Sequence, residues 1–223
     1  MQGLIDFLDR YLAFELEKIP YVVAVLLIAF TVHEFAHAFV AYKFGDPTAK
    51  NQGRVTLNPM SHIDPLGTLL LLVIGFGWAK PVPVNRHYFK RPHLAGVMVS
   101  FMGPFSNLIV ASLGFILYYG LMSTGLGGNE YVYNFLDLLI QINVILFIFN
   151  LLPIPPLDGY RILEDLAPSH IRAKMTQYEA YGALIFLIIV ITPLSNYTIT
   201  PIFQVVLPTV IQGMSSFFAN IFL

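Results

Sequence analysis

The sequence predicts an all-α polytopic membrane protein with about five transmembrane helices. Hydrophobic residues make up 57% of the 223 residues and charged residues only 11%, a balance far from that of an ordinary globular domain. The apolar residues also gather in runs long enough to cross a bilayer core, which needs about 20 helical residues. We expect a single domain over residues 1–223.

Five apolar runs are assigned to crossings. The first three cover Pro20 to Tyr42, Leu94 to about Met122, and Tyr131 to Leu152. Residues 180–223 contain no Asp, Glu, Lys or Arg. They are long enough for two further crossings separated by the turn Pro193–Pro201, and Pro208 is expected to kink the last one.

A further segment is predicted to enter the membrane without crossing it. Leu66 to Trp78 is apolar but too short to span, so we expect this re-entrant segment to dip into the membrane and return. It lies within a region, residues 50–90, that is also expected to form short membrane-associated β-strands. Arg54–Leu57 alternates as a strand does. Lys80–Asn85 is typical of a strand at a sheet edge, because its prolines cannot donate to a ladder.

Basic residues orient the crossings. Residues 123–130 and 194–200 contain none, whereas the other two connections contain ten: Lys43, Lys50, Arg54, Lys80, Arg86, Lys90, Arg91, Arg161, Arg172 and Lys174. By the positive-inside rule the basic connections face the cytoplasm. The N-terminus is then outside and the C-terminus inside. Both flanks of the re-entrant segment lie on the cytoplasmic side.

The N-terminal residues Met1–Lys18 lack the basic start and apolar core of a signal peptide. We predict that they form an amphipathic helix lying at the membrane interface. The formal net charge of -1 gives no sign of a nucleic-acid partner. The chain contains no cysteine, so neither a disulfide framework nor a thiolate metal site is available.

A His-Glu-Phe-Ala-His pentad, residues 33–37, lies inside the first crossing. Residues four apart share one face of a helix, so His33 and His37 are able to bind one cation, with Glu34 close enough to act on its water. Charged groups within a bilayer are costly and mark function by default. The pentad therefore predicts a zinc-dependent hydrolase working within the membrane.

A catalytic zinc usually has three protein ligands and a water, so a third ligand must come from elsewhere. The best candidate is Asp158, in the proline-dense segment Asn150–Gly159 at the cytoplasmic end of the third crossing. Proline leaves backbone groups without their helical hydrogen bonds. Within a membrane, such groups are tolerated only where they lie against protein or line a cavity. Asp158 also fits a helix N-cap, and the two roles are compatible.

Together these patterns resemble the site-2 protease family of intramembrane zinc metalloproteases. The family's N-x-x-P-x-x-x-L-D-G is matched by Asn150, Pro153, Leu157, Asp158 and Gly159, and its G-x-x-x-N by Gly103 and Asn107. The resemblance runs from about His33 to Leu166, and Gly53–Asn85 is similar to small bacterial and archaeal members. We expect a minimal core, without the PDZ domain or appended regulatory domain of other members.

The resemblance implies one zinc ion per chain, bound by His33, His37 and Asp158, with Glu34 as general base. Asn107 and Asn150 are the candidate donors to the oxyanion or to the substrate. The implied substrates are single-pass transmembrane proteins, cut within or near the membrane in regulated intramembrane proteolysis. The implied location is a prokaryotic cell membrane, with membrane lipid as the surroundings. The distribution of basic residues, rather than the resemblance, places the site towards the cytoplasm. The edge at Lys80–Asn85 would receive the substrate as an added strand.

Two other classes of function stay open: a catalytically silent membrane regulator of the same fold, and a metal transporter. The presence of both histidines, Glu34 and Asp158 argues against the first. Against the second, the polar residues gather on the cytoplasmic side, with no acidic or histidine ladder in the outer half.

Several polar residues have a simpler interpretation. The two candidate oxyanion asparagines fit ordinary helix–helix hydrogen bonds, which is also our interpretation of Gln141 and Asn143, since neither belongs to a motif. His62 and His87 flank the re-entrant segment. Loop histidines are usually solvated, but these two are candidates for reaching the metal or gating the site.

Overall fold

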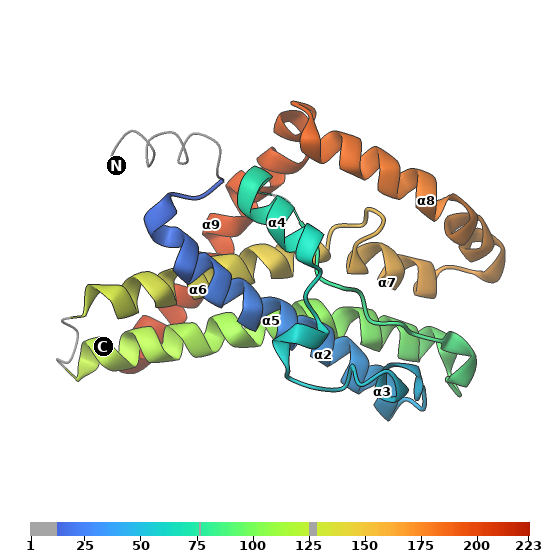
Figure 1. The fold of residues 1–223 in the computed structure, drawn as a ribbon, viewed down its shortest axis with the longest axis horizontal. Coiled ribbons are helices and arrows are strands. Elements are labelled where there is room, and N and C mark those ends of the chain that lie inside the picture. The colour runs from blue at the N-terminus through green and yellow to red at the C-terminus, as the bar shows by residue number, and fades with distance from the viewer. Residues whose placement is uncertain (1–12, 76, 125–128) are drawn as a thin grey trace.

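The computed structural model describes residues 13–75, 77–124 and 129–223, and helices dominate this part of the chain (Figure 1). Its elements are η1 (Leu16–Lys18), α2 (Ile19–Lys43), α3 (Thr48–Asn51), η2 (Pro59–Ser61), α4 (Pro65–Ile74), η3 (Arg86–Tyr88), α5 (Pro92–Ser123), α6 (Glu130–Asn150), α7 (Asp158–Leu166), α8 (Ser169–Ile191) and α9 (Ser195–Phe222).

The long helix α5 forms the centre of the molecule and contacts α2, α6, α7 and α9 (Figure 1). Between α2, α5 and α6 the core consists of Val25, Val110, Leu136 and Leu139. A second core joins α5 and α6 to α9. Helix α8 contacts α7 and α9, and its buried residue is Phe186. The first three long helices are therefore a packed unit, and α8 lies at its margin.

Five helices of the described chain are long and apolar enough to cross a membrane, which confirms the predicted number. They are Leu16–Lys43, which combines η1 and α2, and then α5, α6, α8 and α9. The first three agree with the predicted bounds to within a few residues. Helix α8 begins at Ser169, before the apolar run that starts at residue 180, because its first turns are polar.

The turn predicted over Pro193–Pro201 is wrong in extent. Helix α8 ends at Ile191 and α9 begins at Ser195, so Pro201 and Pro208 both lie inside α9. Proline removes one helical hydrogen bond. Apolar membrane helices nevertheless tolerate proline, because neighbouring groups and small local adjustments satisfy the freed carbonyl.

The predicted β-strands are also wrong, since the described residues form none. Arg54–Leu57 and Lys80–Asn85 do lie close together, but a side chain joins them in place of a ladder. The Arg54 guanidinium donates to the carbonyl oxygens of Lys80 at 2.6 Å and of Pro81 at 3.1 Å. The segment is thus extended but unpaired, because a buried arginine occupies the acceptors that a neighbouring strand would use.

Helix α4 covers most of the segment predicted to be re-entrant. The Asp64 side chain accepts the N–H of Gly67 and caps its first turn. At 10 residues, the helix is about 15 Å long, too short to span. Leu71 and Leu72 near its end pack against Val22 and Leu26 of α2. The helix therefore lies beside the N-terminal half of α2.

The interfacial helix predicted for Met1–Lys18 falls mostly outside the described residues. Of that range the structure describes residues 13–18, and within them η1 forms a short 3-10 turn. Ala13 donates its N–H to the carbonyl of Leu72 at 3.1 Å, so the chain enters α2 next to the end of α4.

Candidate metal centre

Three predicted site residues lie on one stretch of α2, in the packed middle of the molecule. His33, Glu34 and His37 are all buried. Because the histidines are four residues apart on a helix, their rings lie on the same face. The two Nε2 atoms are 3.0 Å apart and the ring planes are nearly perpendicular, at 82°. Both rings therefore aim the same nitrogen at the same point.

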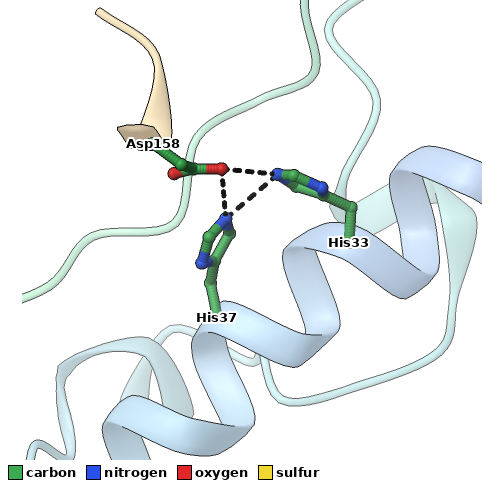
Figure 2. A group of neighbouring side chains, drawn as sticks. All are labelled: His33, His37 and Asp158. Atoms are coloured by element: carbon green, nitrogen blue, oxygen red, sulfur yellow. Dashed lines mark hydrogen bonds and ion pairs between the residues drawn. The ribbon is translucent and has the colours of Figure 1, made fainter. Parts of the chain in front are cut away.

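Asp158 joins the two histidines from a distant part of the sequence (Figure 2). Its Oδ2 lies 3.2 Å from Nε2 of His33 and 3.3 Å from Nε2 of His37. Asp158 is the first residue of α7, and the N-cap position belongs to Leu157, with no side-chain cap bond. The alternative role as an N-cap is therefore wrong, and the carboxylate faces the imidazoles.

Gly159 explains how α7 begins at this place. A Cβ built on Gly159 would lie 2.3 Å from the carbonyl oxygen of Leu151, at the end of α6. Such a contact is far inside van der Waals distance, so only glycine lets the start of α7 lie against the end of α6. The glycine that follows Asp158 thus sets the depth at which the carboxylate meets the histidines.

The hydrogen-bond partners of the two rings indicate that His33, His37 and Asp158 suit a cation. Nδ1 of His33 bonds Oδ1 of Asn107 at 2.7 Å, and Nδ1 of His37 bonds the carbonyl oxygen of Val99 at 2.7 Å. Both partners are acceptors, so each Nδ1 carries the hydrogen and each Nε2 of a neutral ring presents a lone pair. Oδ2 of Asp158 is buried without a hydrogen-bond partner. Three electron-rich atoms therefore face one another.

The spacing of these atoms also fits zinc. Ligand atoms around a tetrahedral zinc ion with bonds of 2.0–2.1 Å are about 3.3–3.4 Å apart, and the three separations here are 3.0, 3.2 and 3.3 Å. Two imidazoles and one carboxylate are a known donor set for catalytic zinc. Among the residues that the structure describes, His33, His37 and Asp158 are the group able to hold a metal ion.

Gly103 of α5 makes the room for the two rings. A Cβ at this position would lie 2.2 Å from Nε2 of His37 and 2.8 Å from Cε1 of His33. The backbone of α5 is thus pressed against the imidazoles, and one methyl group would displace them. The G-x-x-x-N pattern gave Gly103 as a family element, and the structure supplies its physical reason.

Glu34 is held by the extended segment that follows α4. Its Oε2 accepts the backbone N–H of Val82 at 3.0 Å. Three residues later, the N–H of Asn85 donates to the buried carboxylate of Asp46 at 2.6 Å. The segment is therefore fixed at two points, and one of them is the proposed base itself.

A cavity of about 890 Å³ opens beside these groups. Its wall includes His33, Glu34, His37 and Asp158, together with four further polar side chains: Asn85, Arg86, Asn150 and Arg161. The rest of the wall is largely apolar and includes Phe30, Leu146, Phe149, Phe186 and Leu187. The cavity thus combines a polar centre with an apolar surround.

The two candidate oxyanion asparagines differ in their access to this cavity. Asn150 lines it, and its Nδ2 makes one bond, to the carbonyl oxygen of Leu146 at 2.9 Å. Asn107 is fully buried. Its Nδ2 donates to the carbonyl oxygen of Ala29 at 3.2 Å and to Oδ1 of Asn143 at 2.9 Å. Both of its N–H groups are therefore in use, and its predicted oxyanion role has no free donor.

The two flanking histidines do not join the metal cluster. His62 is fully buried, and its Nε2 bonds the carbonyl oxygen of Thr56 at 2.8 Å. Its own carbonyl accepts the N–H of Lys80, so His62 ties together the two segments that flank α4. His87 lines the cavity but lies outside the group of metal-competent side chains in the described chain.

A network of ion pairs that no sequence motif indicated connects the cavity wall to α7. The Arg86 guanidinium pairs with Glu164 at 3.0 Å and with Asp165 at 2.8 Å, and Arg172 of α8 reaches Asp165 at 3.1 Å. Burial raises the pKa of the Asp165 carboxyl despite both arginines. Burial also acts to raise the pKa of Glu164, but hydrogen bonds from Thr176 and Arg86 hold it below its usual value.

Comparison with known proteins gives consistent matches. Residues 128–193 match the family model described as Peptidase family M50. The chain is 52% identical over 221 residues to "Putative zinc metalloprotease YwhC" of Bacillus subtilis, covering 95% of this chain and 98% of that protein. It is 32% identical over 182 residues to "Putative zinc metalloprotease Rip2" of Mycolicibacterium smegmatis, covering 78% and 68% of the two chains. No solved structure matches significantly.

Proposed function

This chain belongs to peptidase family M50, and on that premise we propose that it is a zinc endopeptidase that cuts other membrane proteins within or beside their transmembrane segments. The family inferred from the sequence motifs is thereby confirmed. The remaining features are proposals: a single catalytic domain over residues 1–223, membrane-protein substrates, and a catalytic site reached from the cytoplasm.

One observation carries the proposal. Two histidine lone pairs and a carboxylate oxygen converge within 3.3 Å of one another, and both histidines lie on a helix able to span a membrane. Such a group is costly in apolar surroundings unless a cation neutralises it. A glutamate next to His33 in sequence lines the same cavity. These features fit metal-assisted hydrolysis at membrane depth.

The proposed mechanism assigns a separate role to each side chain. When zinc is bound by His33, His37 and Asp158, it supplies the Lewis acid that polarises the scissile carbonyl and activates a water. Glu34 takes a proton from that water as general base and passes it to the leaving amine. The N–H of Val82 holds Oε2 of Glu34, which orients the carboxylate and leaves its other oxygen for the proton transfer.

We propose Asn150 as the side chain that stabilises the developing oxyanion. It lines the cavity, and one of its two Nδ2 hydrogens bonds the carbonyl of Leu146 on its own helix. The other hydrogen is available to a substrate carbonyl. Asn107 lacks such a free hydrogen because Ala29 and Asn143 accept both.

The proposed topology has five crossings and a re-entrant α4. Leu71 and Leu72 of α4 contact Val22 and Leu26 of α2, about two to three turns above His33 along that helix. The chain then returns to Lys80, whose N–H donates to the carbonyl of His62. With the basic connections in the cytoplasm, the cavity faces that side of a prokaryotic cell membrane.

The test compares cells that express the wild-type chain with cells that express Glu34→Gln. We expect new protein N-termini in the wild-type membrane fraction, located inside or next to predicted transmembrane segments, as measured by quantitative N-terminal proteomics. Glu34→Gln keeps the shape of the side chain but cannot accept the proton. It should therefore bind zinc and generate none of these termini.

Three results would each contradict the proposal. Identical sets of termini in both strains would indicate a catalytically silent regulator. Zinc flux into vesicles that contain either form would indicate a transporter. New N-termini found only in water-soluble regions would contradict the proposal that the substrates are cut at transmembrane segments, although they would still indicate peptidase activity.

A further inference from the structure

A chain of buried amides runs from α6 through α5 to the metal-facing ring of His33. Asn143 donates its Nδ2 to the carbonyl oxygen of Leu139 at 2.8 Å. Its Oδ1 accepts from Nδ2 of Asn107 at 2.9 Å, and Oδ1 of Asn107 accepts from Nδ1 of His33 at 2.7 Å. Asn107 and Asn143 are both 0% exposed.

Two backbone carbonyls fix the direction of every bond in this chain. The carbonyl of Leu139 can only accept, so Asn143 must turn its NH₂ group towards it and its oxygen towards Asn107. Asn107 then presents its NH₂ group to Asn143 and to the carbonyl of Ala29, which lies 3.2 Å away and also can only accept. The oxygen of Asn107 is left for His33, whose Nδ1 must therefore carry the hydrogen.

We propose that Asn143 is a positioning residue, which acts through Asn107 to hold His33 with its Nε2 lone pair directed at the metal. The inference rests on the metal-binding part of the proposed function. A metal-binding histidine usually donates its other ring N–H to a fixed acceptor, which sets both the tautomer and the orientation of the ring. In this chain the acceptor is itself held by a second amide on a third helix.

Without Asn143, the Asn107 amide loses the nearer of the two acceptors that select its orientation and keeps only the carbonyl of Ala29, at 3.2 Å. If the amide turned over, its oxygen would face the carbonyl of Ala29 and its NH₂ group would face His33. That arrangement requires a bare Nδ1 and a hydrogen on Nε2, which is the atom that must bind the metal. An ordinary helix–helix hydrogen bond carries no such consequence, so metal affinity separates the two roles.

The test measures zinc affinity of the purified full chain in detergent, by competition with a coloured chelator. Asn143→Leu keeps the branched shape of the side chain, with added apolar bulk, but has neither donor nor acceptor. We expect it to bind zinc roughly tenfold to a hundredfold more weakly, the usual effect of losing such a partner, and to alter the visible spectrum of the cobalt-loaded protein. Asn143→Asp, when protonated, keeps both bonds and should restore most of the affinity.

Two controls come from the same helix. Gln141→Leu also removes an amide, but one whose hydrogen bond within the described residues goes to Asp137 of its own helix, at 2.7 Å. Val144→Ala removes fully buried apolar volume beside Asn143 and so reports the effect of lost packing alone. Both should bind zinc as the wild type does. If Asn143→Leu does not fold, Asn143→Ala makes the same deletion without added apolar bulk.

Failure of this inference is distinguishable from failure of the proposed function. If the wild type binds no zinc, the proposed function itself is wrong. If the wild type and the controls bind zinc and Asn143→Leu binds it equally well, only the positioning role is wrong. The positioning role is also wrong if Val144→Ala loses as much affinity as Asn143→Leu for an equal drop in melting temperature.

Discussion

At the scale of single residues, the centre depends on small groups as much as on the ligands. Gly103 brings the backbone of α5 against both imidazoles, and Gly159 brings α7 against the end of α6. Neither glycine binds anything. Each permits an approach between two backbones that any larger residue would prevent, and the positions of the ligand atoms follow from these approaches.

Gly103→Ala should therefore weaken metal binding strongly without unfolding the helix. Its methyl group would sit 2.2 Å from Nε2 of His37, so at least one ring must move away. We expect zinc affinity to fall by about a hundredfold or more, beyond the effect of losing one supporting hydrogen bond. Bound zinc, measured by metal analysis after dialysis against a weak chelator, gives the readout.

Gly213→Ala is the matched control, since nothing lies within 4 Å of a Cβ at that position of α9. Alanine has the higher helix propensity, so this variant should be at least as stable as the wild type and bind zinc normally. Wild-type zinc content in Gly103→Ala would show that the two rings do not lie against the backbone of α5.

The group His33, His37 and Asp158 was predictable from the sequence, and so were the supports Gly103, Asn107 and Gly159, but Asn143 was not. His33, His37 and Asp158 belong to short motifs whose spacing carries the chemistry. Asn143 belongs to none, because its role depends on meeting Asn107 of another helix, and that meeting is set by three-helix packing. The sequence led us to interpret Asn143 as a residue that makes a helix–helix hydrogen bond. That bond, to Asn107, is the first of two that connect Asn143 to His33.

At the scale of elements, the short helix α7 connects the metal centre to the rest of the cavity wall. Its first residue is Asp158, the proposed third ligand, and its last turn carries Glu164 and Asp165, which are both buried. Arg86 binds both of these carboxylates. The segment that holds Glu34 and the helix that provides Asp158 are therefore joined by one guanidinium.

Arg86→Met should lower the free energy of unfolding by about 3 kcal/mol, near the lower end for removing one partner of a buried ion pair, because Arg86 itself is partly exposed. Asp165 would then keep its pair with Arg172, and Glu164 its hydrogen bond from Thr176. Adding Glu164→Gln should recover part of the loss by removing one unpaired charge. Circular dichroism of detergent-solubilised protein during unfolding provides the measurement.

Arg161→Met tests whether burial of the ion pairs causes the loss of stability expected for Arg86→Met. Its pair with Glu179 has a length of 2.7 Å, but the two side chains are 41% and 23% exposed. We expect a loss of about 1 kcal/mol or less, as for other exposed pairs. Equal losses for the two arginine variants would argue against a special role for the buried network.

The errors of the element prediction share one physical origin. Arg54–Leu57 and Lys80–Asn85 have the local pattern of strands, but a strand needs a distant partner, and the guanidinium of Arg54 takes those acceptors instead. The start of α8 was missed because Ser169–Glu179 is polar, and a search for apolar runs does not detect helix outside the membrane. The local sequence pattern predicts the backbone conformation of a segment, whereas tertiary packing decides which segment it pairs with.

At the scale of the whole molecule, hydropathy predicted most of the architecture. Burial in lipid requires each span to satisfy its own backbone groups, so an apolar run of sufficient length becomes a helix with little dependence on its neighbours. This explains why the bounds of α2, α5 and α6 were predicted closely. Hydropathy does not predict which helices contact one another. In the described structure, α5 contacts α2, α6, α7 and α9.

The orientation can be tested directly because the chain contains no cysteine. We expect Thr124→Cys, after the end of α5, to react with a membrane-impermeant maleimide in intact cells. Lys90→Cys, in the basic connection before α5, should react only after permeabilisation. Both positions are exposed, so gel-shift labelling reports the side of the membrane rather than burial.

The cysteine-free parent provides the background for that experiment. Labelling of Lys90→Cys in intact cells, with protection of Thr124→Cys, would invert the topology and place the cavity on the outer side. The positive-inside argument would then have to be abandoned, although the metal centre itself would be unaffected.

The separation of the ligands along the chain has a consequence for biosynthesis. The ribosome delivers α2, with both imidazoles, long before it delivers Asp158 at the start of α7. Until that carboxylate has been translated and α7 has docked against α5, the nascent polypeptide has an incomplete ligand set. An interrupted or partly inserted chain is therefore expected to be harmless to its neighbours, and the hydrolase needs no removable inhibitory segment to stay silent during its own synthesis.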